Sequence, residues 1–175
     1  MFSYLEIRDG VLGMQFFRDD VDFYAYDPGF RIQGEAPHKY LKPLFGIDQR
    51  ASLIEFSLSR STHVVQRTLP NDFRFKGKLA RTIWILGNSG TIKEISGIRE
   101  ISDHQNVVNV FCRLKPGDAI TQDMQGTERQ VLMRVYLLAD SKEELDATNL
   151  FVYRCIKIED ENGNDMIQDI YLPNK

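Results

Sequence analysis

The sequence predicts an α+β fold, in which antiparallel strands and separate helices share each core. Near the N-terminus, two short strand patterns flank a turn that contains Asp19, Asp20 and Asp22, which is typical of a β-hairpin. Farther along the chain, several strand patterns are separated by turn residues, so this region is expected to be β-rich. Two helical patterns begin directly after Asp48 and Ser141, which are favoured helix N-cap residues.

The first expected region covers residues 1–62. Its elements are strands at 11–17 and 23–27, a short helix at 38–45 that contains Pro43 and ends before Gly46, and a helix that begins after Asp48. In the second helix, Ala51, Ile54 and Leu58 fall on one face. The polar stretch 61–78 contains Pro70 and Gly77, and we expect the domain boundary within it.

The second expected region covers residues 63–175. The expected strands are 81–86, 91–95, 107–114, 130–138, 156–158 and 166–172, of which 130–138 is the strongest pattern. A helix is expected at 141–153, where Ser141 and Glu144 have the spacing of a capping box. This helix would close the β-rich domain. Cys112 and Cys155 are far apart in sequence and lie in apolar segments, so we expect two reduced core thiols.

Composition excludes several classes of protein. The chain has 175 residues, of which 42% are hydrophobic and 27% charged, as in ordinary globular proteins. The formal net charge is -3 and no run of basic residues occurs, which argues against a nucleic-acid partner. No segment approaches the roughly 20 apolar residues of a membrane span, and the first twenty residues lack an apolar signal segment. We therefore expect no membrane partner and a cytoplasmic location.

The N-terminal hairpin contains the residues best suited to chemistry. A register centred on the acidic turn places Gln15 opposite Asp27, and opposite residues project to the same face of a sheet. An amide oxygen and a carboxylate on one face suit Mg²⁺, which takes oxygen ligands and often only one or two from the protein. Arg31 follows four residues later and can bind phosphate or carboxylate. The alternative is an ordinary polar surface, with Pro28-Gly29 as a simple turn.

The succession of motifs over residues 10–59 resembles the C-terminal stretch of the ATP-grasp domain, in the form found in proteins similar to the carbamoyl-phosphate synthase large subunit. The residues that carry this resemblance are Gln15-Phe16, then Asp27-Pro28-Gly29-Phe30-Arg31, then Gly34, then Gly46-Ile47-Asp48. The later segments GTIKEISGI, KPGDAI and ADSKEELDATNLFVYRCIKI resemble the β-rich C-terminal domain of the same ligases.

This resemblance implies an ATP-dependent ligase that activates a carboxylate as an acyl phosphate, which an amine or another nucleophile then attacks. It implies ATP and Mg²⁺ (or Mn²⁺) as cofactors, with Gln15 and Asp27 as metal ligands and Arg31 as the electrostatic clamp on the transferred phosphoryl group. The loop 33–37 would contact substrate. Gly34, Glu35 and His38 are its candidates, with solvated loop residues as the alternative for Glu35 and His38.

The sequence also departs from the family pattern. Asp27 stands where a glutamate is usual, and Gly13 and Gly29 stand where asparagine is frequent. The chain lacks the family's N-terminal region and glycine-rich loop, so we expect that region as a partner and the isolated chain to be inactive. Apolar residues on both faces of the hairpin predict a homo-oligomer. Two alternatives stay open, a non-catalytic binding or dimerisation module and a degenerate ATP-grasp remnant.

Overall fold

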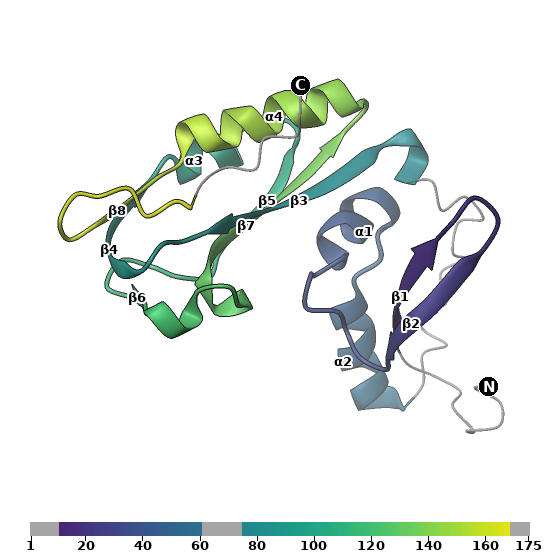
Figure 1. The fold of residues 1–175 in the computed structure, drawn as a ribbon. Helices are drawn as coiled ribbons and strands as arrows, with labels where there is room; N and C mark the ends of the chain where they lie inside the picture. Colours follow the sequence, from purple (N-terminus) through teal and green to yellow (C-terminus); the bar gives the residue numbers. More distant parts are fainter. Residues whose placement is uncertain (1–10, 61–74, 169–175) are drawn as a thin grey trace. The chain divides into compact units, whose positions relative to one another are not determined.

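The chain forms two compact units, which span Met1–Phe73 and Arg74–Lys175. The structure, a computed structural model, describes residues 11–60 and 75–168 (Figure 1). It confirms the α+β class, because helices and antiparallel sheets are both present. The boundary expected after residue 62 lies outside the described residues. No helix among 11–60 and 75–168 is long and apolar enough to cross a membrane.

The first unit consists of a two-stranded hairpin and two helices. Its elements are β1 (Gly13–Arg18), β2 (Phe23–Gly29), α1 (His38–Phe45) and α2 (Gln49–Ser59). The acidic turn closes the hairpin because the Asp19 carboxylate accepts hydrogen bonds from the backbone N–H groups of Asp22 (2.7 Å) and Val21 (2.8 Å). These two hydrogen bonds hold the pKa of Asp19 below its usual value.

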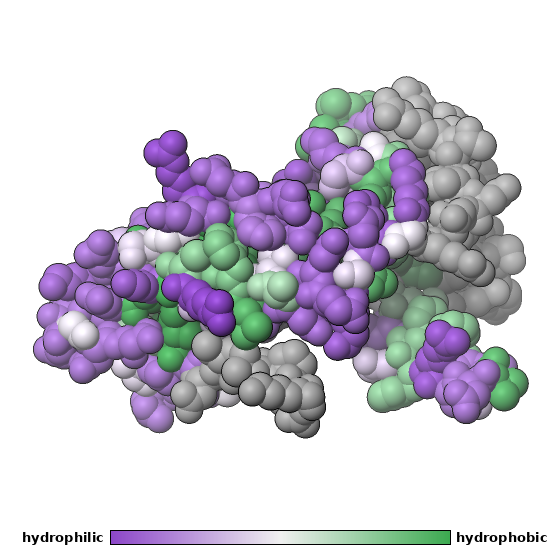
Figure 2. Space-filling model, turned by 90° about the horizontal axis from the view of Figure 1, so that it is seen from above, coloured by the Kyte–Doolittle hydropathy of each residue, from purple (hydrophilic) through white to green (hydrophobic). Residues whose placement is uncertain are grey.

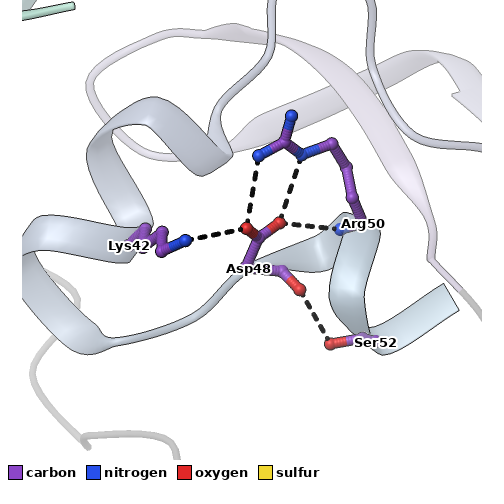
Figure 3. A network of polar contacts seen from close by, with 4 residues as sticks. All are labelled: Lys42, Asp48, Arg50 and Ser52. Carbon is purple, nitrogen blue, oxygen red and sulfur yellow. Dashed lines mark hydrogen bonds and ion pairs between the residues drawn. The ribbon is translucent and has the colours of Figure 1, made fainter. Parts of the chain in front are cut away.

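The end of α1 and the start of α2 are those that the sequence predicts. Gly46 ends α1 in the left-handed conformation at φ 71°, which glycine adopts without steric cost. Asp48 is the N-cap of α2, and its Oδ1 accepts a hydrogen bond from the backbone N–H of Arg50 at 3.1 Å. Figure 3 shows the same carboxylate bound by the side chains of Arg50 and Lys42. One carboxylate therefore caps α2 and ties it to α1.

The second unit contains two three-stranded antiparallel sheets, with strand orders β3-β7-β5 and β6-β4-β8. The strands are β3 (Leu79–Leu86), β4 (Gly90–Ser96), β5 (Val107–Cys112), β6 (Ala119–Ile120), β7 (Val131–Ala139) and β8 (Lys157–Asp160). The helices are α3 (Ile98–Ser102) and α4 (Lys142–Cys155), with 3₁₀ turns at Phe75–Gly77, Gln122–Met124 and Glu128–Gln130.

The central strand β7 organises the core of the second unit. All nine of its residues are buried, and β3 and β5 pair with its two edges. Val135 and Leu137 share a hydrophobic cluster with Leu145 and Val152 of α4. Arg134 is buried as well, and its guanidinium lies 4.0 Å from the centre of the Trp84 ring on the neighbouring strand. The continuous apolar pattern that predicted this strand thus reflects burial on both faces.

Helix α4 begins with a variant of the expected capping box. The Ser141 hydroxyl accepts a hydrogen bond from the Glu144 N–H at 3.1 Å. The Glu144 carboxylate binds the N–H of Asp140, one residue before the N-cap, at 3.0 Å. Both contacts satisfy N–H groups at the start of the helix.

The second unit departs from the expectations in three places. The hairpin expected across the Asn162-Gly163 turn is present only in part: Asp165 forms an isolated antiparallel bridge with Glu159, and the Met166 N–H donates to the Ile158 carbonyl at 2.8 Å. Residues 166–168 form no strand, and 169–172 lie outside the described residues. Helix α3 was not expected. Cys112 and Cys155 are free thiols, but Cys112 is exposed because it ends the edge strand β5.

Candidate functional site on the N-terminal hairpin

The hairpin register brings the two expected metal ligands together. Gln15 of β1 is the direct antiparallel partner of Asp27 of β2, which confirms the predicted pairing. Opposite residues have their Cβ atoms about 5 Å apart on the same face of the sheet. This face, defined by Gly13, Gln15, Asp27 and Gly29, is called the ligand face below.

A β-bulge next to this pair adds a side chain that sequence reasoning missed. Gln15 pairs with Asp27 but Phe16 pairs with Ala25, so Tyr26 has no partner in the register. The Tyr26 hydroxyl donates a hydrogen bond to the Gln15 amide oxygen at 2.5 Å. Its ring stacks on Phe17, with the ring centres 4.5 Å apart. The bulge therefore turns Tyr26 toward the ligand face, where its hydroxyl holds the amide oxygen that would bind a cation.

Two glycines leave the open end of the ligand face without side chains. Gly13 and Gly29 are direct cross-strand partners. A Cβ on Gly13 would lie 2.7 Å from Cγ and 2.8 Å from Nε2 of Gln33, and a Cβ on Gly29 would lie 3.6 Å from Nε of Arg31. Because these Cβ positions project to the same face as Gln15 and Asp27, the side chains of Arg31 and Gln33 lie over the ligand face. The chain that follows β2 thus folds two polar side chains back onto the hairpin.

Most polar side-chain groups on the ligand face make few hydrogen bonds or ion pairs with the described residues. The Arg31 guanidinium donates to its neighbouring carbonyl, that of Ile32, at 3.3 Å. Within residues 11–60 and 75–168, no hydrogen bond or ion pair is recorded for the Asp27 carboxylate or the Gln33 amide. A carboxylate, a guanidinium and two amides are therefore available to a bound ligand.

The expected substrate loop, residues 33–37, follows β2 in the chain and leads into α1. Gly34 and Glu35 are exposed, and the loop closes with a hydrogen bond from the Ala36 N–H to the Gln33 carbonyl at 3.2 Å. His38, the first residue of α1, is buried at 6% exposure rather than solvated. Neither ring nitrogen has a hydrogen-bond partner among the described residues. Burial, and next the positive charge of Arg50, hold the pKa of His38 below its usual value, so the imidazole is neutral at pH 7.

Comparison with solved structures identifies the fold. The chain is similar to an L-amino acid ligase from Bacillus licheniformis, with a TM-score of 0.64 and 22% identity over 92% of this chain and 40% of that one. It is also similar to a phosphoribosylglycinamide synthetase from Anaerococcus prevotii, with a TM-score of 0.69 and 13% identity over 91% of this chain and 39% of that one. Both are ATP-grasp enzymes. The chain has the fold of a portion of these two ATP-grasp enzymes.

The chain spans about two fifths of each solved structure that it matches. No family model and no curated protein matches the sequence. The fold is therefore established by the three-dimensional likeness to two ligases, while the activity of this chain is argued below from its own residues.

Proposed function

We propose that the chain is part of an ATP- and Mg²⁺-dependent (or Mn²⁺-dependent) ligase that activates a carboxylate as an acyl phosphate for attack by an amine or another nucleophile. The observation that carries this proposal is the placement of Gln15, Asp27 and Arg31 on one face of the hairpin. The ATP-grasp fold of the chain supports it, because the solved structures with this fold include two carbon–nitrogen ligases.

The ligand face fits Mg²⁺ by the chemistry of its donors. No group of three or more His, Cys, Asp or Glu side chains that could hold a metal occurs within residues 11–60 and 75–168. An amide oxygen and one carboxylate, Gln15 and Asp27, are what Mg²⁺ needs when phosphate oxygens and waters supply the other ligands. Bound with ATP, the metal would neutralise negative charge on the phosphates.

Arg31 and the loop that follows supply the remaining parts of the proposed site. The Arg31 guanidinium would bind the transferred phosphoryl group and stabilise the charge that develops on it. Gly34 and Glu35 are exposed next to it in sequence, and we assign them to the carboxylate or amine substrate. His38 is buried, so we assign it to the support of this loop. It would affect bound substrate only indirectly, through the residues that cover it.

A calorimetric titration of the chain with ATP and Mg²⁺ tests the proposal. We expect weak binding that Asp27→Ala and Arg31→Ala each reduce about tenfold or more, because each removes a charged contact to the nucleotide or its metal. Asp20→Ala and Arg99→Ala are the matched controls, since both residues are exposed and outside the ligand face. The proposal fails if the chain binds no Mg-ATP, or if the controls and the site variants behave alike.

A second candidate function is a binding or dimerisation module. The first unit exposes many large hydrophobic side chains: Leu12, Phe16, Phe17, Val21, Phe23, Tyr24, Tyr26, Phe30, Ile54 and Leu58. Such surfaces usually mark contact sites. The proposed partners are the rest of an ATP-grasp protein or a second copy of the chain. Association without nucleotide binding would favour this function, and the absence of both would indicate a degenerate remnant.

A further inference from the structure

Gln33 occupies a position that only a glycine at residue 13 permits. Gly13 is buried in β1, and the side chain of Gln33 crosses directly over it. A Cβ at position 13 would lie 2.7 Å from Gln33 Cγ, closer than real Cβ atoms come to another carbon. The backbone of Gly13 has a negative φ, so the glycine is needed there for space and not for a left-handed conformation.

Gln33 and Arg31 lie beside each other on the ligand face. They cover Gly13 and Gly29, which face one another across the two strands. The Cβ positions of such a pair are about 5 Å apart, so the Gln33 and Arg31 side chains that lie against them are close enough to contact one polyphosphate. The pair next along the hairpin is Gln15 and Asp27, the proposed metal ligands.

We propose that Gln33 is an additional ligand-binding residue, whose side-chain amide donates a hydrogen bond to a phosphoryl oxygen of the polyphosphate that Arg31 and the metal hold. This inference rests on the proposed function, since it assigns a further contact to the same site. The Gln33 amide suits the role because it is half-buried and no partner is recorded for it among the described residues. Gly13 is then the residue that positions Gln33, although it has no side chain of its own.

The test measures binding of inorganic triphosphate with Mg²⁺ to the chain by calorimetry. We expect Gln33→Ala to weaken binding about three- to tenfold, as for loss of one hydrogen bond to a charged group at a partly exposed site. Gln33→Glu should weaken it further, because a carboxylate cannot donate and repels the anion. Gln105→Glu is the control, since it makes the same charge change at an exposed residue of the second unit.

The Gly13→Ala variant provides an independent test of the same inference. It should weaken binding in the native background by displacing Gln33, and it should cause no further loss in the Gln33→Ala background. Thermal melts of each variant confirm folding.

Equal binding by Gln33→Ala and the native chain, with loss in Arg31→Ala, would overturn this inference and leave the proposed function standing. Absence of binding by the native chain would overturn both, and additive losses in the double variant would overturn the role of Gly13.

Discussion

Tyr26 makes one specific hydrogen bond through its hydroxyl. It donates to the Gln15 amide oxygen, and its ring is fixed by stacking on Phe17. A carbonyl oxygen has two lone pairs, so Gln15 can accept this bond and still coordinate a cation. Groups that orient a metal ligand in this way typically contribute 10- to 100-fold to metal affinity.

We therefore predict that Tyr26→Phe weakens Mn²⁺ binding about tenfold, measured by the electron paramagnetic resonance signal of free Mn²⁺. Tyr24→Phe is the matched control, because Tyr24 pairs with Phe17 two positions away and has no recorded contact with Gln15. Equal effects of the two substitutions would contradict the role of the Tyr26 hydroxyl.

His38 makes a separate prediction about pH. Its pKa is lowered in the folded chain, so below the ordinary value near 6.5 the unfolded chain binds a proton that the folded chain does not. The stabilisation from the neutral buried imidazole is full above pH 6.5 and is lost as the pH falls toward the folded pKa. We expect the urea midpoint to drop between pH 7.5 and pH 5.5, and to drop less in His38→Phe. A His38→Phe variant with the same pH slope as the native chain would refute this.

At this scale the sequence predicted how some candidate residues pair and could not predict other contacts. The register of Gln15 with Asp27 followed from the acidic turn, because turn position fixes pairing in a hairpin. The bulge that turns Tyr26 toward the ligand face adds one residue to one strand, and no residue type in that segment marks it. Gln33 lies over Gly13 through a contact twenty positions apart in sequence, which local patterns do not encode.

Among the elements, α2 depends most clearly on one residue. The Asp48 carboxylate caps the helix, binds the Arg50 guanidinium and contacts Lys42 at 3.4 Å, while its carbonyl accepts from the Ser52 hydroxyl (Figure 3). The hydrogen bonds from Arg50 are the main reason that the pKa of Asp48 is far below its usual range. This lowered pKa makes Asp48 stabilising above its ordinary pKa near 3.9, and the stabilisation is lost as the pH falls below that value.

We predict that Asp48→Ala lowers the free energy of unfolding of the first unit at pH 7 by about 1–2 kcal/mol, through loss of the cap and its ion pairs. Asp48→Asn is the control that separates the two contributions, since asparagine keeps a cap oxygen but has no charge. It should lose less than half as much. Circular dichroism during urea unfolding gives both values, and an equal loss in the two variants would show that the cap contributes nothing.

Among the helices and strands, the long ones with a clear residue pattern could be predicted from the sequence. The nine-residue strand β7, apolar except for Arg134, and the Ser141 cap of α4 identify those elements without tertiary information. Helix α3 spans only five residues and has Gly97 at its N-cap in the left-handed conformation. A Cβ there would lie 2.0 Å from the carbonyl oxygen of Cys155, so tertiary packing selects this start, which explains why the sequence pattern missed it.

At the scale of the whole molecule, we predict that the chain alone has no ATPase or ligase activity. The ligand face offers one arginine and the two proposed metal ligands, whereas in-line transfer requires both reactants to be held. The chain spans about two fifths of the ligase structures that it matches. Substrate-dependent phosphate release by the purified chain, above the level of Arg31→Ala, would disprove this prediction.

We also predict that the chain associates through the first unit. Apolar side chains (green) reach the surface between hydrophilic ones (Figure 2), and on α2 Ile54 is 63% exposed and Leu58 83%. Burying such groups is favourable by about 25 cal/mol per Å². Light scattering should show a dimer or larger species that Ile54→Glu with Leu58→Glu dissociates. A native chain that stays monomeric at high concentration and binds no dye for apolar surfaces would rule this out.

The central position of β7 also determines the order in which the second unit can form during synthesis. β3 is made first, but its strand partner among the described residues is β7, which begins 45 residues after β3 ends, and β5 likewise pairs with β7. Until residue 139 has left the ribosome, both partner strands have unsatisfied edges that can pair with other chains. Nascent chains stalled before β7 should therefore recruit holding chaperones and be cleaved readily by protease, while chains extended past α4 become resistant in one step. Once folded, the β7 amides should be the slowest in the unit to exchange with deuterium, because they open only when both neighbouring strands leave.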